Sequence, residues 1–134
     1  MCVYLAARYR RREELQQYAA ELRAAGVEVV STWLDEIMAD YDGRVRSAAD
    51  AVAIAYRDLY DLGRADTIVL FTDDPADPAS TGGKDVEWGY ALSPRYTKIV
   101  VGPRSNVFTA LADRQYYGWP GALEIVGDRH EERY

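Results

Sequence analysis

The sequence predicts a single-domain α/β protein, with an open parallel sheet of four or five strands and helices on both of its faces. The main observation is that short apolar runs, typical of buried strands, alternate along the chain with segments of helical periodicity. This alternation requires parallel pairing with right-handed crossovers. The second observation is the length of 134 residues, which suits one domain. We therefore assign residues 1–127 to one domain and residues 128–134 to a polar C-terminal tail.

Apolar runs bounded by charged or turn-forming residues mark the expected strands. The first four are residues 2–7 (CVYLAA), 27–32 (VEVVST), 65–74 (ADTIVLFTDD) and 98–102 (KIVVG). The third of these is the clearest, because it contains four consecutive apolar residues at 68–71. A further apolar run at residues 122–127 (ALEIVG) is the expected fifth strand.

Segments between these strands carry the expected helices. Leu15, Ala19 and Leu22 recur at helical spacing after the first strand, and Gly26 is a natural C-terminal stop. An apolar helical face also runs along residues 47–62. It consists of Ala49, Val52, Ala53, Tyr56 and Leu59. Residues 84–93 are expected to form a short third helix, and residues 33–44, rich in acids and turn formers, a loop.

Composition excludes several classes of partner. A formal net charge of −6 does not suit a protein that binds duplex nucleic acid, because such binding depends on lysine and arginine. No apolar run is long enough to span a bilayer, and the first residues lack the pattern of a signal peptide, so we expect a cytoplasmic protein without a membrane partner. One cysteine and one histidine give no support for a zinc site, and no metal or cofactor is expected.

Unusual residues gather after the strands. Arg8, Arg10, Arg11 and Arg12 follow the first strand, residues 73–84 follow the third, and Pro103 to Asn106 follow the fourth. In an open parallel sheet, ligands bind beyond the carboxyl ends of the strands, where the strand order reverses. This edge of the sheet is therefore the predicted site.

The loop before Glu87, in the stretch GGKDVEWGYAL, is not a phosphate loop of the Walker type. That motif needs a glycine and a Ser or Thr at positions that here hold Pro78 and Asp85. A dinucleotide fingerprint is also absent, since AARYRRR after the first strand contains no glycine. The groups left for chemistry are carboxylates, tyrosines and arginines.

The arginines oppose the charge preference of a helix N-terminus, which favours acids by about 0.3–1 kcal/mol per charge. A bound phosphate would balance Arg8 or Arg10 through guanidinium groups and free backbone N–H groups. Internal pairing with Glu13 and Glu14 is the alternative explanation.

Three stretches together resemble the nucleoside 2-deoxyribosyltransferase superfamily, which includes the 2'-deoxynucleoside 5'-monophosphate N-glycosidases. They are VYLAARY, RDLYDLGRADTIVLFT and GGKDVEWGYALS…KIVVG, and the resemblance covers roughly residues 3 to 110. The most specific piece is the acid before Gly-Tyr-Ala in EWGYA. The resemblance implies a flavodoxin-like fold and cleavage of the bond between a base and C1' of a sugar.

The resemblance also implies roles for individual residues. The nucleophilic glutamate falls on Glu87, the tyrosine near the sugar or nucleophile on Tyr4, and the aspartate used on the base on Asp58. The transferases carry an aspartate six residues before the nucleophile. This chain has Thr81 there, which is similar to the phosphate-binding serine of the monophosphate hydrolases.

Further positions follow the hydrolase pattern. Arg10 matches an arginine directed toward the phosphate, and Ser105, followed by Asn106, matches a serine lent to the neighbouring subunit's phosphate. The resemblance therefore implies a homodimer or higher homo-oligomer. The chain departs from both branches in lacking glycines after the first strand.

A carboxylate suits this chemistry for a physical reason. Breaking an N-glycosidic bond builds positive charge at C1', which a carboxylate can stabilise or capture as a glycosyl ester. Glu87 is expected in the first turn of its helix, where the dipole would favour its ionised form, and Gly82 and Gly83 would allow close approach of the substrate. Asp58, Asp73 and Asp74 are candidates for protonating or hydrogen-bonding the departing base.

Two functions fit these observations. One is a hydrolase or transferase that acts on a (deoxy)nucleoside or its 5'-monophosphate. The other is a non-catalytic module that binds and senses a nucleotide on the same fold. The missing aspartate at Thr81 and the missing glycines favour the second.

Overall fold

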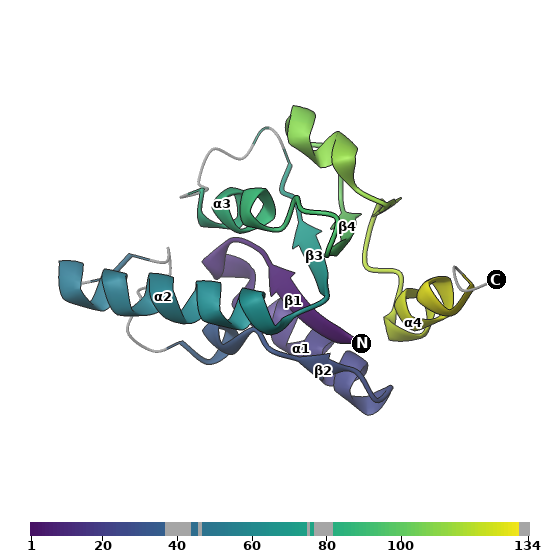
Figure 1. Cartoon of the computed structure of the whole chain (residues 1–134), viewed down its shortest axis with the longest axis horizontal. Helices are drawn as coiled ribbons and strands as arrows, with labels where there is room; N and C mark the ends of the chain where they lie inside the picture. Colours follow the sequence, from purple (N-terminus) through teal and green to yellow (C-terminus); the bar gives the residue numbers. More distant parts are fainter. Residues whose placement is uncertain (37–43, 46, 75, 77–81, 132–134) are drawn as a thin grey trace.

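A computed structural model describes residues 1–36, 44–45, 47–74, 76 and 82–131 (Figure 1). Within these residues, five strands form one sheet in the order β2-β1-β3-β4-β5, and every pairing is parallel. The strands are β1 (Cys2–Ala6), β2 (Glu28–Val29), β3 (Thr67–Phe71), β4 (Thr97–Val101) and β5 (Arg114–Tyr116). This is the doubly wound order of flavodoxin-like folds, so the predicted α/β fold class is confirmed.

Helices cover both faces of the sheet. They are α1 (Arg12–Ala24), α2 (Ala48–Arg64), α3 (Gly83–Tyr90) and α4 (Ala122–Glu131), with 3-10 turns η1 (Tyr9–Arg11), η2 (Thr32–Asp35) and η3 (Val107–Leu111). Helices α1 and α4 pack together on one face, while α2 and α3 lie on the other, over β1 and β3 (Figure 1). No helix in the described ranges is both long enough and apolar enough to cross a membrane.

The core follows the sequence pattern closely at the centre of the sheet. All five residues of β3 are buried, as are Val3 to Ala6 of β1, because each of these strands has helices on both sides. Leu15, Ala19 and Leu22 of α1 are buried as predicted. Helix α1 ends at Ala24, and Gly26, just after its C-cap, has a φ of 85° in the left-handed region that glycine adopts without strain.

The C-terminal part of the predicted sheet is wrong. Residues 122–127 begin helix α4, and the fifth strand is instead Arg114–Tyr116. Ala122 and Ile125, three residues apart, are buried on one side of α4, which packs against α1. Helix α4 continues to Glu131, across the boundary expected at residue 127. Strand β5 lies in a stretch for which no strand was predicted.

Two further expectations need correction. The second strand covers only Glu28–Val29 rather than residues 27–32, because the chain turns into η2 at Thr32. The predicted apolar face of α2 does not pack into the core, since Val52 is 54% exposed and Tyr56 is 73% exposed. Helix α2 is buried at its C-terminal end instead, through Asp61 and Leu62.

Candidate active site

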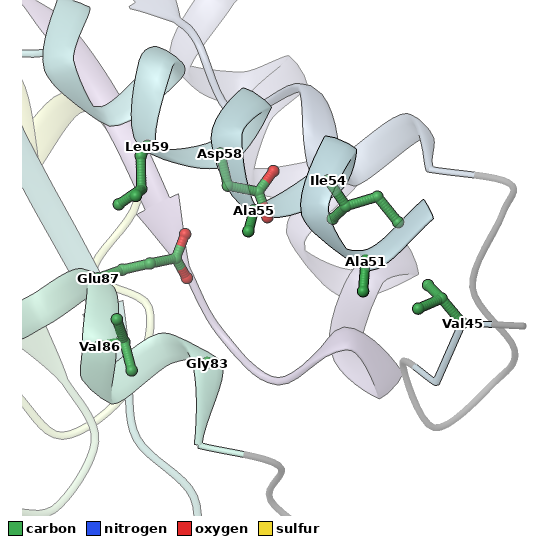
Figure 2. Close-up of a pocket in the computed structure, with 9 residues that line it drawn as sticks. All are labelled: Val45, Ala51, Ile54, Ala55, Asp58, Leu59, Gly83, Val86 and Glu87. Atoms are coloured by element: carbon green, nitrogen blue, oxygen red, sulfur yellow. The ribbon is translucent and has the colours of Figure 1, made fainter. Parts of the chain in front are cut away.

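A pocket of about 320 Å³ lies between α2 and α3 (Figure 2). It is lined by Val45, Ala51, Ile54, Ala55, Asp58, Leu59, Gly83, Val86 and Glu87. Helix α3 follows the carboxyl end of β3, and α2 runs back toward the start of β3, so the first part of each helix lies at the carboxyl edge of the sheet. The pocket therefore lies where the order reverses between β1 and β3, as predicted.

Glu87 projects from α3 toward α2 into this pocket (Figure 2). Its carboxylate oxygen Oε2 accepts a hydrogen bond from the hydroxyl of Tyr4, a fully buried residue in the middle of β1. Glu87 lies in the second turn of α3, whereas Asp85 is the acid of the first turn. The helix dipole acts mainly within the first turn, so the expected dipole support for Glu87 does not apply.

Burial raises the pKa of Glu87 to about 8, because the pocket removes water from the charged form. The Tyr4 hydroxyl opposes this effect, since a donated hydrogen bond stabilises a carboxylate. The result is a carboxyl group that changes charge near neutral pH, and strongly shifted pKa values of this kind cluster at functional sites.

Asp58 brings a second carboxyl group to the same pocket from α2 (Figure 2). Its oxygen Oδ1 accepts from Nη2 of Arg57 at 3.0 Å and from Nε at 3.3 Å. Burial raises the pKa of Asp58, and the neighbouring Arg57 guanidinium acts in the opposite direction. The pocket thus combines two carboxyl groups with otherwise apolar walls.

The two glycines at the start of α3 leave room for a ligand. Gly82 has a φ of 86° and precedes the helix, while Gly83 lines the pocket. A methyl group added at either position would meet open space. Thr81 lies outside the described residues.

The other predicted binding residues do not line this pocket. Arg8 is half-buried after β1, and Arg10 is exposed in η1. Ser105 and Asn106 are exposed before η3, where Asn106 Oδ1 accepts from the backbone N–H of Phe108 at 2.9 Å. Asn106 therefore has a structural role as the N-cap of η3.

Internal pairing explains part of the arginine cluster. Arg11 binds both carboxylate oxygens of Glu14, at 2.9 and 2.8 Å, and donates to the carbonyl of Thr72 at 3.0 Å. Arg12 donates to the carbonyl of Glu36. For Arg11 the internal alternative is confirmed.

The other candidate acids also have local partners. Asp73 pairs with Arg11 and with the buried Lys84, each at 3.4 Å. Asp74 Oδ1 accepts from the backbone of Ala76 at 2.9 Å. Neither residue lines the pocket, which leaves Asp58 as the acid that faces Glu87 across it.

The α2 wall of the pocket is formed by Ala51, Ile54, Ala55, Asp58 and Leu59. Of these, Asp58 alone was predicted as a site residue. The five positions are i, i+3, i+4, i+7 and i+8, which is the spacing of one helical face. This signal was present in the sequence but overlapped with the alternative face through Val52 and Tyr56. In the described ranges, no group of three or more His, Cys, Asp or Glu side chains could hold a metal ion.

No protein-family model matches the chain, and no curated protein matches it in sequence. Solved structures do match it. A conserved protein from Enterococcus faecalis V583 matches with a TM-score of 0.64 and 14% identity, over 100% of this chain and 99% of that one. The CMP N-glycosidase BcmB from Clostridium botulinum matches with a TM-score of 0.51 and 16% identity, over 100% of both chains. Over its full length the chain thus shares the fold of a CMP N-glycosidase, which confirms, at the level of the fold, the resemblance predicted from its motifs.

Proposed function

We propose that the protein cleaves the N-glycosidic bond of a (deoxy)nucleoside or its 5'-monophosphate, with Glu87 as the nucleophile. The observation that carries this proposal is the Glu87 carboxylate, desolvated in a pocket and bonded by the Tyr4 hydroxyl. The shared fold with a CMP N-glycosidase supports the same reaction type. The pocket volume of about 320 Å³ is at the small end of ligand sites, which suits a base and its sugar.

The reaction has two steps. The Glu87 carboxylate attacks C1' of the sugar while the bond from C1' to the base nitrogen breaks. The base leaves with the electron pair of that bond and takes up a proton. Water then hydrolyses the glycosyl ester and restores the carboxylate, whereas attack by a second base would give transfer.

Tyr4 and Asp58 assist these steps in different ways. Tyr4 holds oxygen Oε2 of Glu87, which orients the carboxylate and favours its ionised, nucleophilic form. Asp58 faces the same pocket and provides acceptor oxygens for an N–H group of the base. The apolar walls from α2 and Val86 keep water away from the reacting carbon until the base departs.

A non-catalytic nucleotide sensor is the second candidate function. It is favoured by the pKa of about 8 for Glu87, because a carboxyl group protonated at neutral pH binds a ligand without attacking it. The same pocket and acceptor groups would serve for recognition.

A base-release assay separates the two functions. The protein is mixed with deoxyribo- and ribonucleosides and their 5'-monophosphates, with and without a second free base, and the products are separated by chromatography. We expect release of free base from at least one substrate. Exchange that requires the second base would identify a transferase. A nucleotide that binds saturably in calorimetry and stays intact for hours would instead establish the sensor.

We further propose that a second copy of the chain covers the exposed apolar face of α2. Val52, Tyr56 and Tyr60 recur every four residues and are 54%, 73% and 67% exposed, which is unusual for large side chains on one helix face. Val86, 67% exposed, extends this surface across the pocket on α3. A partner placed there would close the open side of the pocket.

Sedimentation velocity tests this association. We expect a dimer or larger homo-oligomer at micromolar concentration, and Tyr56→Glu should shift it toward monomer by placing a charge in the contact. Leu123→Glu is the matched control, because Leu123 is 81% exposed on α4, on the other face of the sheet. A monomeric wild-type protein with full activity would contradict the proposal.

A further inference from the structure

Arg57 holds Asp58 by one oxygen only. Two nitrogens of its guanidinium, Nη2 and Nε, donate to oxygen Oδ1 of Asp58 at 3.0 and 3.3 Å. Among the residues that the structure describes, none donates to Oδ2 of Asp58. The Asp58 side chain is 22% exposed and lines the pocket, so an acceptor oxygen is available to a ligand.

The third nitrogen of Arg57 is anchored in the protein. Nη1 donates to the carboxylate of Glu36, whose side chain is only 3% exposed. The backbone carbonyl of Glu36 in turn accepts from the Tyr9 hydroxyl at 2.7 Å and from Arg12. Glu36 is therefore fixed at its backbone and at its side chain, and it fixes the guanidinium beside Asp58.

This anchoring has a chemical consequence for the pocket. Burial raises the pKa of Asp58, and the Arg57 guanidinium at hydrogen-bond distance opposes this by favouring the ionised form. An ionised carboxylate can only accept hydrogen bonds. An exocyclic amino group presents donors to such an acceptor, as in the pairing of Asp or Glu with N4 of cytosine. Uracil offers only its N3–H, which lies between two carbonyl oxygens that a carboxylate repels.

We propose that Arg57, anchored by Glu36, is a positioning residue that orients Asp58 as a fixed hydrogen-bond acceptor and so makes the site selective for bases with an exocyclic amino group. The inference rests on the proposed function, because it assigns the base to this pocket. It adds the chemical class of base that the pocket takes and the residues that set the preference.

Cytosine and uracil substrates give the sharpest test, because the two bases differ only in the amino or carbonyl group at C4 and the proton at N3. Base release is measured for deoxycytidine and deoxyuridine and for their 5'-monophosphates. We expect the wild-type kcat/KM to favour cytosine by about tenfold or more, and Arg57→Met to lower this ratio by about tenfold. Arg57→Lys should restore part of the ratio, and Glu36→Gln should lower it.

Arg64→Met is the matched control. Arg64 lies on the same helix and pairs with a buried aspartate, Asp61, at 3.2 Å, but it does not line the pocket. Its loss should leave the cytosine-to-uracil ratio unchanged. Circular dichroism checks that each variant folds. If Arg57→Met is unfolded, the double variant Arg57→Met with Glu36→Gln, which removes both charges of this contact, replaces it.

Equal loss of kcat/KM for both bases in Arg57→Met would show a merely structural role and overturn the inference. A wild-type protein without preference between the bases would overturn it as well. If no substrate releases base, the proposed function fails, and the inference is then decided by calorimetric Kd values for dCMP and dUMP. It stands only if wild type prefers dCMP and Arg57→Met loses that preference.

Discussion

Replacement of Glu87 by glutamine is expected to lower kcat for base release by at least about a thousandfold. The amide has nearly the same shape as the carboxyl group, but it cannot form the glycosyl ester and carries no charge to stabilise C1'. The variant still accepts the hydrogen bond from Tyr4 through its amide oxygen. Initial rates measured by chromatography on the best substrate, with saturating concentrations, give the comparison.

Asp85→Asn is the matched control for this substitution. Asp85 lies two residues earlier on the same helix, its side chain is 42% exposed, and its nearest described cation is Lys84 at 3.9 Å. Removing its charge should change kcat by no more than a few-fold, since Asp85 does not line the pocket and its own carboxylate is exposed to solvent. Retention of a tenth or more of the activity in Glu87→Gln would exclude Glu87 as the nucleophile.

The rate of base release is expected to rise about tenfold per pH unit from pH 6 to about 8 and to level off above that. The reason is that the ionised form of Glu87 attacks C1', and burial raises the pKa of this group to about 8. Tyr4→Phe should move the midpoint to higher pH, because it removes the hydrogen bond that favours the carboxylate. The profile of kcat/KM against pH, for a substrate that does not titrate in this range, measures both effects.

Stability is expected to change with pH in the opposite sense to the rate. The folded-state pKa of Glu87 lies above the ordinary value of 4.5. The contribution of Glu87 to the stability of the folded state is therefore fully present below pH 4.5 and is lost as the pH rises through about 8. The glutamine in Glu87→Gln does not titrate. As the pH rises through this window, the free energy of unfolding of the variant should therefore increase relative to that of wild type, by roughly a few kcal/mol. Urea unfolding of both proteins at pH 5 and pH 9 measures the difference. A flat rate profile together with a constant difference in stability would contradict the raised pKa.

The centre of the fold could be predicted from the sequence, because its local signals agree with its environment. Strands β1, β3 and β4 each contain a continuous apolar run, and the structure buries most of their residues. The edges could not be predicted in the same way. Residues 122–127 form too short an apolar run to distinguish a strand from a buried helix turn. Strand β5, Arg-Gln-Tyr, has little apolar character and owes its conformation to pairing with β4.

Part of the candidate site could also be predicted from the sequence. Glu87 and Gly83 were expected near the carboxyl edge of the sheet, whereas Tyr4 and Asp58 were implied by the family resemblance. In the structure Glu87, Asp58 and Gly83 line one pocket, and Tyr4 donates a hydrogen bond to Glu87. The anchoring of Arg57 by Glu36 was not predictable. These residues are 21 positions apart, and their contact depends on how η2 turns beside α2. Acids and arginines are too common in this sequence for such a pair to be recognised without a structure.

The short outer strands have a consequence for how copies of this chain can meet. With two residues in β2 and three in β5, the sheet presents very little unpaired backbone at either edge. Another chain cannot readily add a strand to such an edge, which protects the protein against sheet extension and fibre growth. The proposed contact between copies uses side chains on α2 rather than strand pairing, so single substitutions there would change its strength without disturbing the hydrogen bonds of the sheet.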